Sequence, residues 1–222
     1  MFNIILSDKI RNAAPGLRIL AIEADVLNPA TDDNLWHAIE EEAERIAGSY
    51  VLEMINKRTA IAATRAAYKA LGKEPNRYRP SAEALCRRVV NGKGLYRLTT
   101  LVDFINLISM KTGHSIGGFD ADKISGEKLV LGVGVHDEEF HAIGRGTLNI
   151  ENLPVYRDEI GGIGTPTSDE ERTKLTPETK RLLMLINVYD KTEDIEALKK
   201  LTLDLLQTYC NPKSINTSIT SI

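Results

Sequence analysis

The apolar pattern of this chain changes at Gly113, and no other feature constrains the fold as strongly. Before it, apolar residues recur with helical spacing over 32–71, 81–90 and 100–113. After it, short β-branched runs alternate with turns that contain Gly and Asp. A 3.6-residue period is typical of helices that bury one face, and short runs between turns are typical of strands. The order therefore predicts an α+β fold, with helices packed on a mostly antiparallel sheet.

Six strands are expected, two near the N-terminus and four after the helices. They are 2–7, 17–28, 116–119, 128–135, 153–156 and 182–189. The run 183–188 is almost entirely apolar, which predicts a central strand buried on both faces. A last helix is expected over 192–209, and the polar tail 211–222 is expected to fray. No linker or repeat interrupts the chain, so we expect one domain over 1–222.

Two helices have clear end signals. Pro80 is suited to the first turn of a helix, because its missing N–H would have no partner there. Arg87 and Arg88 end this helix with positive charge, which complements the helix dipole. Thr100 and Asp103 have capping-box spacing and predict where the next helix begins. Gly113 ends it.

Composition and motifs exclude several functions. The net charge of −3 gives no general attraction to nucleic acid, so we expect no DNA partner and only local contact with RNA. Two distant cysteines favour a reducing cytoplasm, and no apolar window is long enough to cross a membrane. His136 and His141 do not have the spacing of an HExxH zinc site. The glycine pairs lack the GxGxxG pattern, so we expect neither metal nor nucleotide cofactor.

The positive residues gather in one short segment of an acidic protein. They are Arg79, Arg87, Arg88, Lys93 and Arg97. Clustered cations bind RNA phosphates through charge-assisted hydrogen bonds, and nearby tyrosines offer stacking faces, so these residues are candidates for RNA binding. The alternative is ordinary helix-end charge that pairs with the acidic helix within 32–71.

A second group of candidates could bind a small ligand. Asn106 lies among apolar residues, and an amide there can both donate and accept hydrogen bonds. Gly117 and Gly118 leave the backbone open to a ligand, and Phe119 and Asp120 follow at once. These five residues are the predicted ligand-binding set. The alternative for Asn106 is a structural contact with the Gly117–Gly118 backbone.

The segments LVDFINLISMKTG and GGFDADKI resemble the B3/B4 domain, the editing and RNA-associated module of the phenylalanyl-tRNA synthetase beta subunit. The resemblance covers about 77–188 and is strongest over 101–124. The stretches RPSAEALCRR and TKLTPETK are more similar to free-standing members of this family. The sequence contains no adenylate-forming motif, so it is not expected to charge a tRNA.

The resemblance implies recognition of tRNA, aminoacyl-tRNA or a free amino acid, and if the protein is an enzyme it implies an aminoacyl-tRNA deacylase that acts on mischarged tRNA in trans. Gly117 occupies the position of a histidine that synthetase modules commonly carry, and Asn187 stands in the late strand where an acidic residue is expected. The catalytic residues therefore stay unassigned. A non-catalytic module that binds an amino acid or a protein is the alternative.

Overall fold

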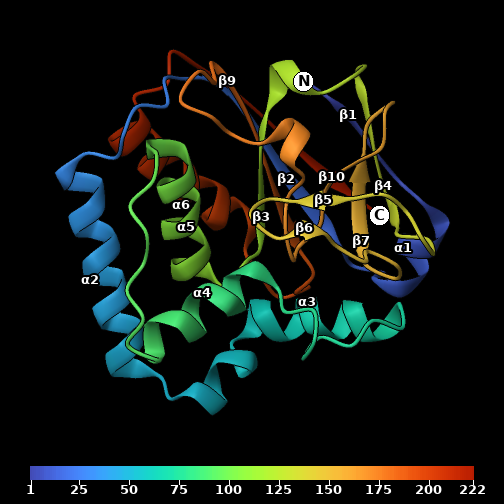
Figure 1. Ribbon diagram of the computed structural model, residues 1–222, viewed down its shortest axis with the longest axis horizontal. Coiled ribbons are helices and arrows are strands. Elements are labelled where there is room, and N and C mark those ends of the chain that lie inside the picture. Colours follow the sequence, from blue (N-terminus) through green and yellow to red (C-terminus); the bar gives the residue numbers. More distant parts are fainter.

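The computed structural model describes residues 1–222 and has an α+β fold (Figure 1). The strands are β1 (Asn3–Leu6), β2 (Arg18–Asp25), β3 (Ile116–Asp120), β4 (Lys128–Val133), β5 (His141–Ala142), β6 (Gly146–Thr147), β7 (Pro154–Arg157), β8 (Gly162–Gly164), β9 (Arg181–Val188) and β10 (Ser214–Ser221). The α-helices are α1 (Asp8–Ala13), α2 (Asp33–Ser49), α3 (Thr59–Ala70), α4 (Ser81–Val90), α5 (Thr100–Thr112) and α6 (Ile195–Cys210). Short 3-10 helices are η1 (Leu52–Lys57), η2 (Ala121–Lys123) and η3 (Glu171–Thr173).

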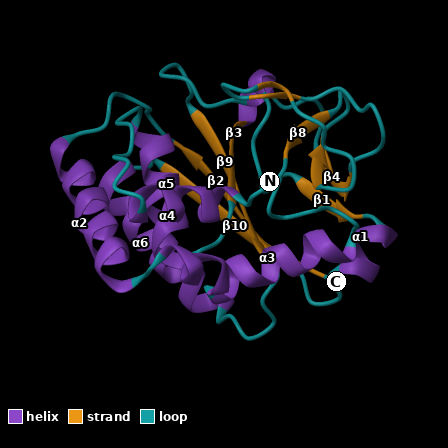
Figure 2. Ribbon diagram, turned by 60° about the horizontal axis from the view of Figure 1, so that its bottom comes forward, coloured by secondary structure: helices purple, strands orange, loops and turns teal.

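The molecule has three layers, which Figure 2 shows nearly edge-on. The middle layer is a four-stranded sheet in the order β10-β2-β9-β3. Helices α2, α4, α5 and α6 cover one face of this sheet, and a second four-stranded sheet in the order β1-β4-β7-β8 packs on the other. All strand pairs in the two sheets are antiparallel except β1 with β4. The predicted class, helices on a mostly antiparallel sheet, is confirmed.

Strand β9 occupies an interior position in the middle sheet, as its apolar run predicted. Side chains alternate between the two faces of a strand. Leu182, Met184 and Ile186 therefore join the core beneath the helices, while Leu183 and Leu185 join the core between the two sheets. A strand that contributes to two cores needs apolar residues on both faces, and this explains the absence of polar alternation over 182–186.

The ends of the chain correct two predictions. The tail that was expected to fray forms β10, whose eight residues pair with β2 in continuous antiparallel register. Its polar composition concealed a strand at the edge of the sheet, where β-branched residues such as Ile215 and Thr217 are favoured and one face stays wet. Helix α1, which Ser7 caps through its side chain, was not predicted, and its end at Ala13 overlaps the break expected at 12–16.

The helices follow the predicted pattern closely. Helix α4 has the predicted bounds, and α5 begins at Thr100 and ends before Gly113, whose φ of 82° closes the helix in the left-handed region. The start of α5 was predicted through the wrong interaction. Thr99 is the N-cap and makes no capping bond, while Asp103 accepts hydrogen bonds from Leu98 N and from the Thr31 hydroxyl. None of the helices combines the length and the apolar character that a membrane-spanning helix requires.

Candidate functional site

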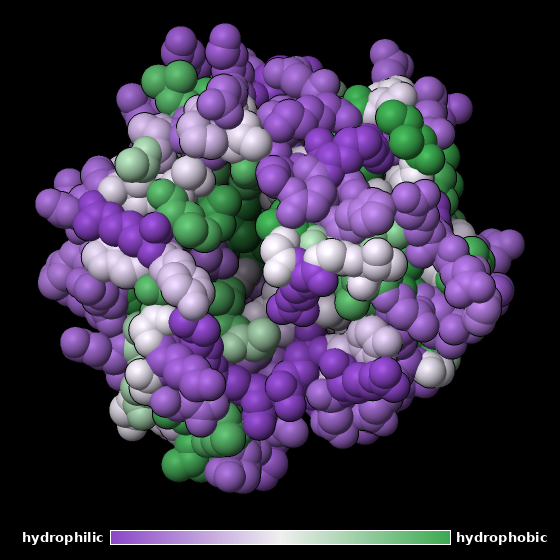
Figure 3. Space-filling model, viewed as in Figure 1, coloured by the Kyte–Doolittle hydropathy of each residue, from purple (hydrophilic) through white to green (hydrophobic).

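An apolar pocket lies between helices α4 and α5 and the outer edge of strand β3. Its volume is about 390 Å³. Its hydrophobic wall consists of Leu85, Leu98, Val102, Ile105, Ile116, Ile143 and Leu175. Figure 3 shows this side of the molecule as a hollow with hydrophobic side chains along its wall and hydrophilic ones around the rim. A concave and mostly apolar space with a few polar groups is the usual form of a small-molecule site.

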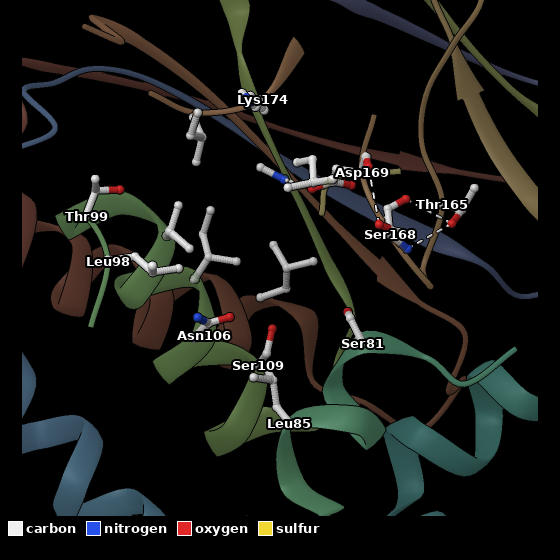
Figure 4. Close-up of a pocket in the computed structure, with 16 residues that line it drawn as sticks. Ser81, Leu85, Leu98, Thr99, Asn106, Ser109, Thr165, Ser168, Asp169 and Lys174 are labelled. Atoms are coloured by element: carbon white, nitrogen blue, oxygen red, sulfur yellow. Dashed lines mark hydrogen bonds between the residues drawn. The ribbon is translucent and has the colours of Figure 1, made fainter. Parts of the chain in front are cut away.

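Polar groups enter this pocket from two opposite sides (Figure 4). Asn106 and Ser109 come from helix α5, one turn apart. Thr165, Ser168 and Asp169 come from the loop after β8. Asn106 is half-buried and its side chain makes no hydrogen bond within the protein. Its amide is therefore available to a ligand.

A basic groove adjoins the apolar pocket. We use this name for the concavity formed by Arg79, Arg87, Arg88, Asn91, Lys93 and Arg145, together with residues of α4. No Asp or Glu lines it. The groove and the pocket share Ser81, Leu85 and Asn106, so they form one continuous depression.

Most cations of the groove lack an acidic partner. Arg79, Lys93 and Arg145 are exposed and form no ion pair. Arg88 donates to the carbonyl of Gly94 and lies 4.5 Å from the ring centre of Tyr96, which is exposed. Because these cations form no ion pair within the protein, their charge is available to bind an anionic ligand.

Two of the predicted RNA-binding residues, Arg87 and Arg97, have acidic partners within the protein. Arg97 donates to the Thr31 carbonyl and to the carboxylate of Asp33, at 2.7 Å, and does not line the groove. Arg87 lines the groove, but it also lies 3.7 Å from Glu83. The alternative interpretation, pairing with the acidic helix α2, therefore describes Arg97. Arg145, which sequence reasoning missed, joins the group from the β5–β6 turn.

The predicted ligand-binding residues of β3 lie on two different faces of the strand. Gly118 faces the apolar pocket, where a Cβ would come within 2.4 Å of Ile105 Cδ1, so the absence of a side chain lets α5 approach the strand. Gly117 faces the other way, toward the Phe119 ring. Phe119 is fully buried between the two sheets. Its place in the other core follows from strand alternation, which the sequence-based grouping overlooked.

Asp120 lies outside the pocket as well. Its carboxylate accepts from the Thr179 hydroxyl and from the backbone of Asp122, and Lys123 approaches to 3.4 Å. These contacts hold the turn after β3. Of the five predicted residues, the pocket brings together only Asn106 and Gly118.

Asp169 is the acidic residue of the site, and sequence reasoning did not single it out. Its Oδ2 accepts a hydrogen bond from Gly118 N at 3.1 Å. Burial raises the pKa of Asp169 to about 7, and the Gly118 hydrogen bond opposes that rise only in part. Asp169 follows Gly118 by 51 positions in the chain, so only the tertiary structure reveals its place. The late strand β9 offers no carboxyl to this site: no residue of β9 lines the pocket, and Asn187 accepts a buried hydrogen bond from the Tyr156 hydroxyl.

No group of three or more His, Cys, Asp or Glu side chains in the structure is arranged to hold a metal ion. His136 and His141, considered in the sequence, each pair with an acidic neighbour in the chain, Asp137 and Glu139.

Comparison with protein-family models gives a match to the B3/4 domain over residues 63–220. The chain belongs to the B3/B4 domain family. The match is wider than the 77–188 expected from the motifs and includes all of β10 except its last residue. The N-terminal fragment of the phenylalanyl-tRNA synthetase beta subunit from Pyrococcus horikoshii has a similar fold, with a TM-score of 0.51 and 14% identity. The similarity covers 99% of this chain and 54% of that one, so the chain spans about half of the fragment. No curated protein matches the chain.

Proposed function

We propose that this B3/B4 domain binds the aminoacylated 3′ end of a tRNA in the cytoplasm. The main support for this proposal is that the apolar pocket is continuous with the basic groove through Ser81, Leu85 and Asn106. An aminoacyl side chain suits the pocket, and the phosphates of the adjoining nucleotides suit the groove. The similarity to a subunit of a tRNA synthetase supports the same class of ligand.

The charge distribution favours RNA over a neutral ligand. The protein carries a net charge of −3, yet the groove contains five cations and no acid. Arg88 lies against the ring of Tyr96, which is 69% exposed and offers a face on which a base can stack. Phosphate contacts supply affinity without sequence selectivity, so the pocket would supply the discrimination.

Removing charge from the groove should weaken tRNA binding. We expect the triple variant Arg79→Ala, Lys93→Ala, Arg145→Ala to lose affinity by on the order of 10- to 100-fold, because three unpaired cations no longer meet phosphates. The slope of log affinity against log salt should become shallower by about 2. Fluorescence anisotropy with labelled tRNA measures both quantities.

A matched variant carries the same charge change elsewhere. Lys128, Lys180 and Lys213 are exposed, lie outside the groove and form no ion pair. Replacing all three with Ala should leave the salt slope of tRNA binding close to that of the wild type. Equal losses in the two triple variants would mean that general charge, and not the groove, attracts the RNA.

Asn106 should contribute to recognition of the aminoacyl group. We expect Asn106→Ala to weaken binding of phenylalanine linked through an amide to 3′-amino-3′-deoxyadenosine by about 3- to 10-fold, the value of one hydrogen bond. Titration calorimetry measures the affinity, and urea unfolding checks the fold. Asn12→Ala, at an exposed position on α1, is the control. Unchanged affinity in a folded Asn106 variant would remove this residue from the site.

A further question is whether the domain also hydrolyses mischarged tRNA in trans. Ester hydrolysis needs donors aimed at the developing oxyanion. Gly118 N already donates to Asp169, and Gly161 N donates to Asp158, so two backbone groups that could act as such donors are engaged. The geometry therefore favours recognition. Turnover in a deacylation assay with mischarged tRNAs would extend the proposal to editing, and saturable binding of free amino acids without tRNA affinity would favour the non-catalytic alternative.

A further inference from the structure

Asp169 is a carboxyl group without a cation. Only one of its oxygens, Oδ2, has a hydrogen-bond partner in the protein, namely Gly118 N. Oδ1 has no partner and is not sealed from solvent. A half-buried carboxylate that lacks a partner is costly unless a proton or a ligand cation neutralises it. Asp169 lines the apolar pocket, so a positive group of a ligand in that pocket could neutralise its carboxyl.

The other charged groups around the pocket either have partners within the protein or belong to the basic groove, so none of them pairs with Asp169. Lys174 lines the pocket but pairs with Glu171. Glu170, next in the chain, caps η3 through Arg172 N. Arg145 belongs to the basic groove, and helices α4 and α5 bring no charged side chain into the pocket. The protein thus supplies no counter-ion for Asp169.

The depression combines three kinds of surface. The pocket contains the Asp169 carboxyl and a mostly apolar wall, and the groove that adjoins it is positive. Asp169 comes from the sheet side and Asn106 from the helix side of the pocket (Figure 4). A complementary ligand carries an ammonium group at one end, an apolar group beside it and phosphates at the other. Among the ligands of the proposed function, an aminoacyl-nucleotide with a free α-amino group has this order of charges.

We propose that Asp169 binds the protonated α-amino group of the aminoacyl ligand, so that the pocket selects apolar aminoacyl groups whose amine is free. This inference rests on the proposed function and names the substrate class of the same site. An N-acylated ligand would place a neutral amide against the carboxyl group and lose the ion pair. The pocket would thereby distinguish ordinary aminoacyl-tRNA from N-blocked forms.

The test compares two ligands and two proteins. The ligands are phenylalanine amide-linked to 3′-amino-3′-deoxyadenosine and the same compound with an acetylated α-amine. The proteins are the wild type and Asp169→Asn, whose amide oxygen can still accept from Gly118 N. We expect the wild type to prefer the free amine by about 10-fold or more. The variant should lose most of that preference, while its affinity for the acetylated ligand stays nearly unchanged.

Two results would overturn the inference. One is equal affinity of the wild type for both ligands. The other is an equal loss for both ligands in an Asp169→Asn protein that unfolds in urea at the wild-type midpoint, which would indicate general damage to the pocket. Binding of uncharged tRNA tests the proposed function separately from the role of Asp169. It depends on the groove, so Asp169→Asn should not change it. A wild type that binds neither tRNA nor the adenosine ligands would overturn the proposed function and this inference together.

Discussion

Affinity for a ligand with a free α-amine should fall by up to about tenfold for each pH unit below 7. The folded protein holds a proton on Asp169 until the pH exceeds its pKa of about 7, whereas the ion pair requires the carboxylate. Below that value, binding must first remove the proton, and one unit of pKa corresponds to a factor of ten. Between pH 7 and pH 5 the loss should be about 50-fold, because half of the Asp169 carboxyl groups already carry a proton at pH 7.

The upper limb of the pH curve should come from the ligand. An α-amino group loses its proton near pH 8, so affinity should decline again above this value and give a bell-shaped profile. No histidine lines the pocket, and an adenosine ligand without phosphate adds no group that titrates near 7. Asp169→Asn should be flat between pH 5 and pH 7. Calorimetric titration at several pH values measures the curve, and a flat wild-type profile would contradict the assignment.

Glu83→Ala should cost about 3 to 5 kcal/mol of unfolding free energy, the largest effect on stability expected from one substitution in this region. Glu83 is 1% exposed and accepts from Arg65 Nη1 at 2.8 Å. Arg65 is also buried and donates further to Pro75 O and Asn76. Truncation of the carboxylate leaves a buried guanidinium without its counter-charge. Urea unfolding measures the change.

Two further variants serve as controls for this measurement. Glu53→Ala removes an exposed carboxylate from η1 and should change the unfolding free energy by less than about 0.5 kcal/mol. The double variant Arg65→Met, Glu83→Leu removes both charges at once and should recover most of the loss, because apolar residues of similar volume often replace a buried pair well. A loss below about 1 kcal/mol for Glu83→Ala would mean that the pair does not fix α4 against α3.

The helical half of the site could be predicted from sequence because its signals are local. Pro80, Gly113 and the apolar period define α4 and α5, and the side of α5 that carries Asn106 follows from helical spacing. The sheet half depends on pairing between distant segments. Six strands were predicted approximately, whereas β5, β6, β8 and β10 were not. The division into two sheets, which places Phe119 away from the pocket, is set by packing that no short segment encodes.

The same reasoning explains why Asp169 and Arg145 were missed. Both lie in irregular segments, one after β8 and one in the turn between β5 and β6, where neither periodicity nor capping indicates a direction. Their importance arises from neighbours far along the chain, Gly118 for Asp169 and the α4 cations for Arg145. Arg97, by contrast, lies close to the other basic residues in the sequence, but in the structure it forms an ion pair with Asp33.

The basic groove and the far wall of the apolar pocket are formed by different parts of the chain. The cations are held mainly by α4 and the segment after it, whereas Ile143, Ser168 and Leu175 on the far wall belong to loops that contribute little to the helical core. Under the proposed function, substitutions in those loops would change which aminoacyl side chain is accepted without changing the affinity of the groove for RNA phosphates. Members of one lineage could diverge in amino-acid preference without rebuilding the scaffold.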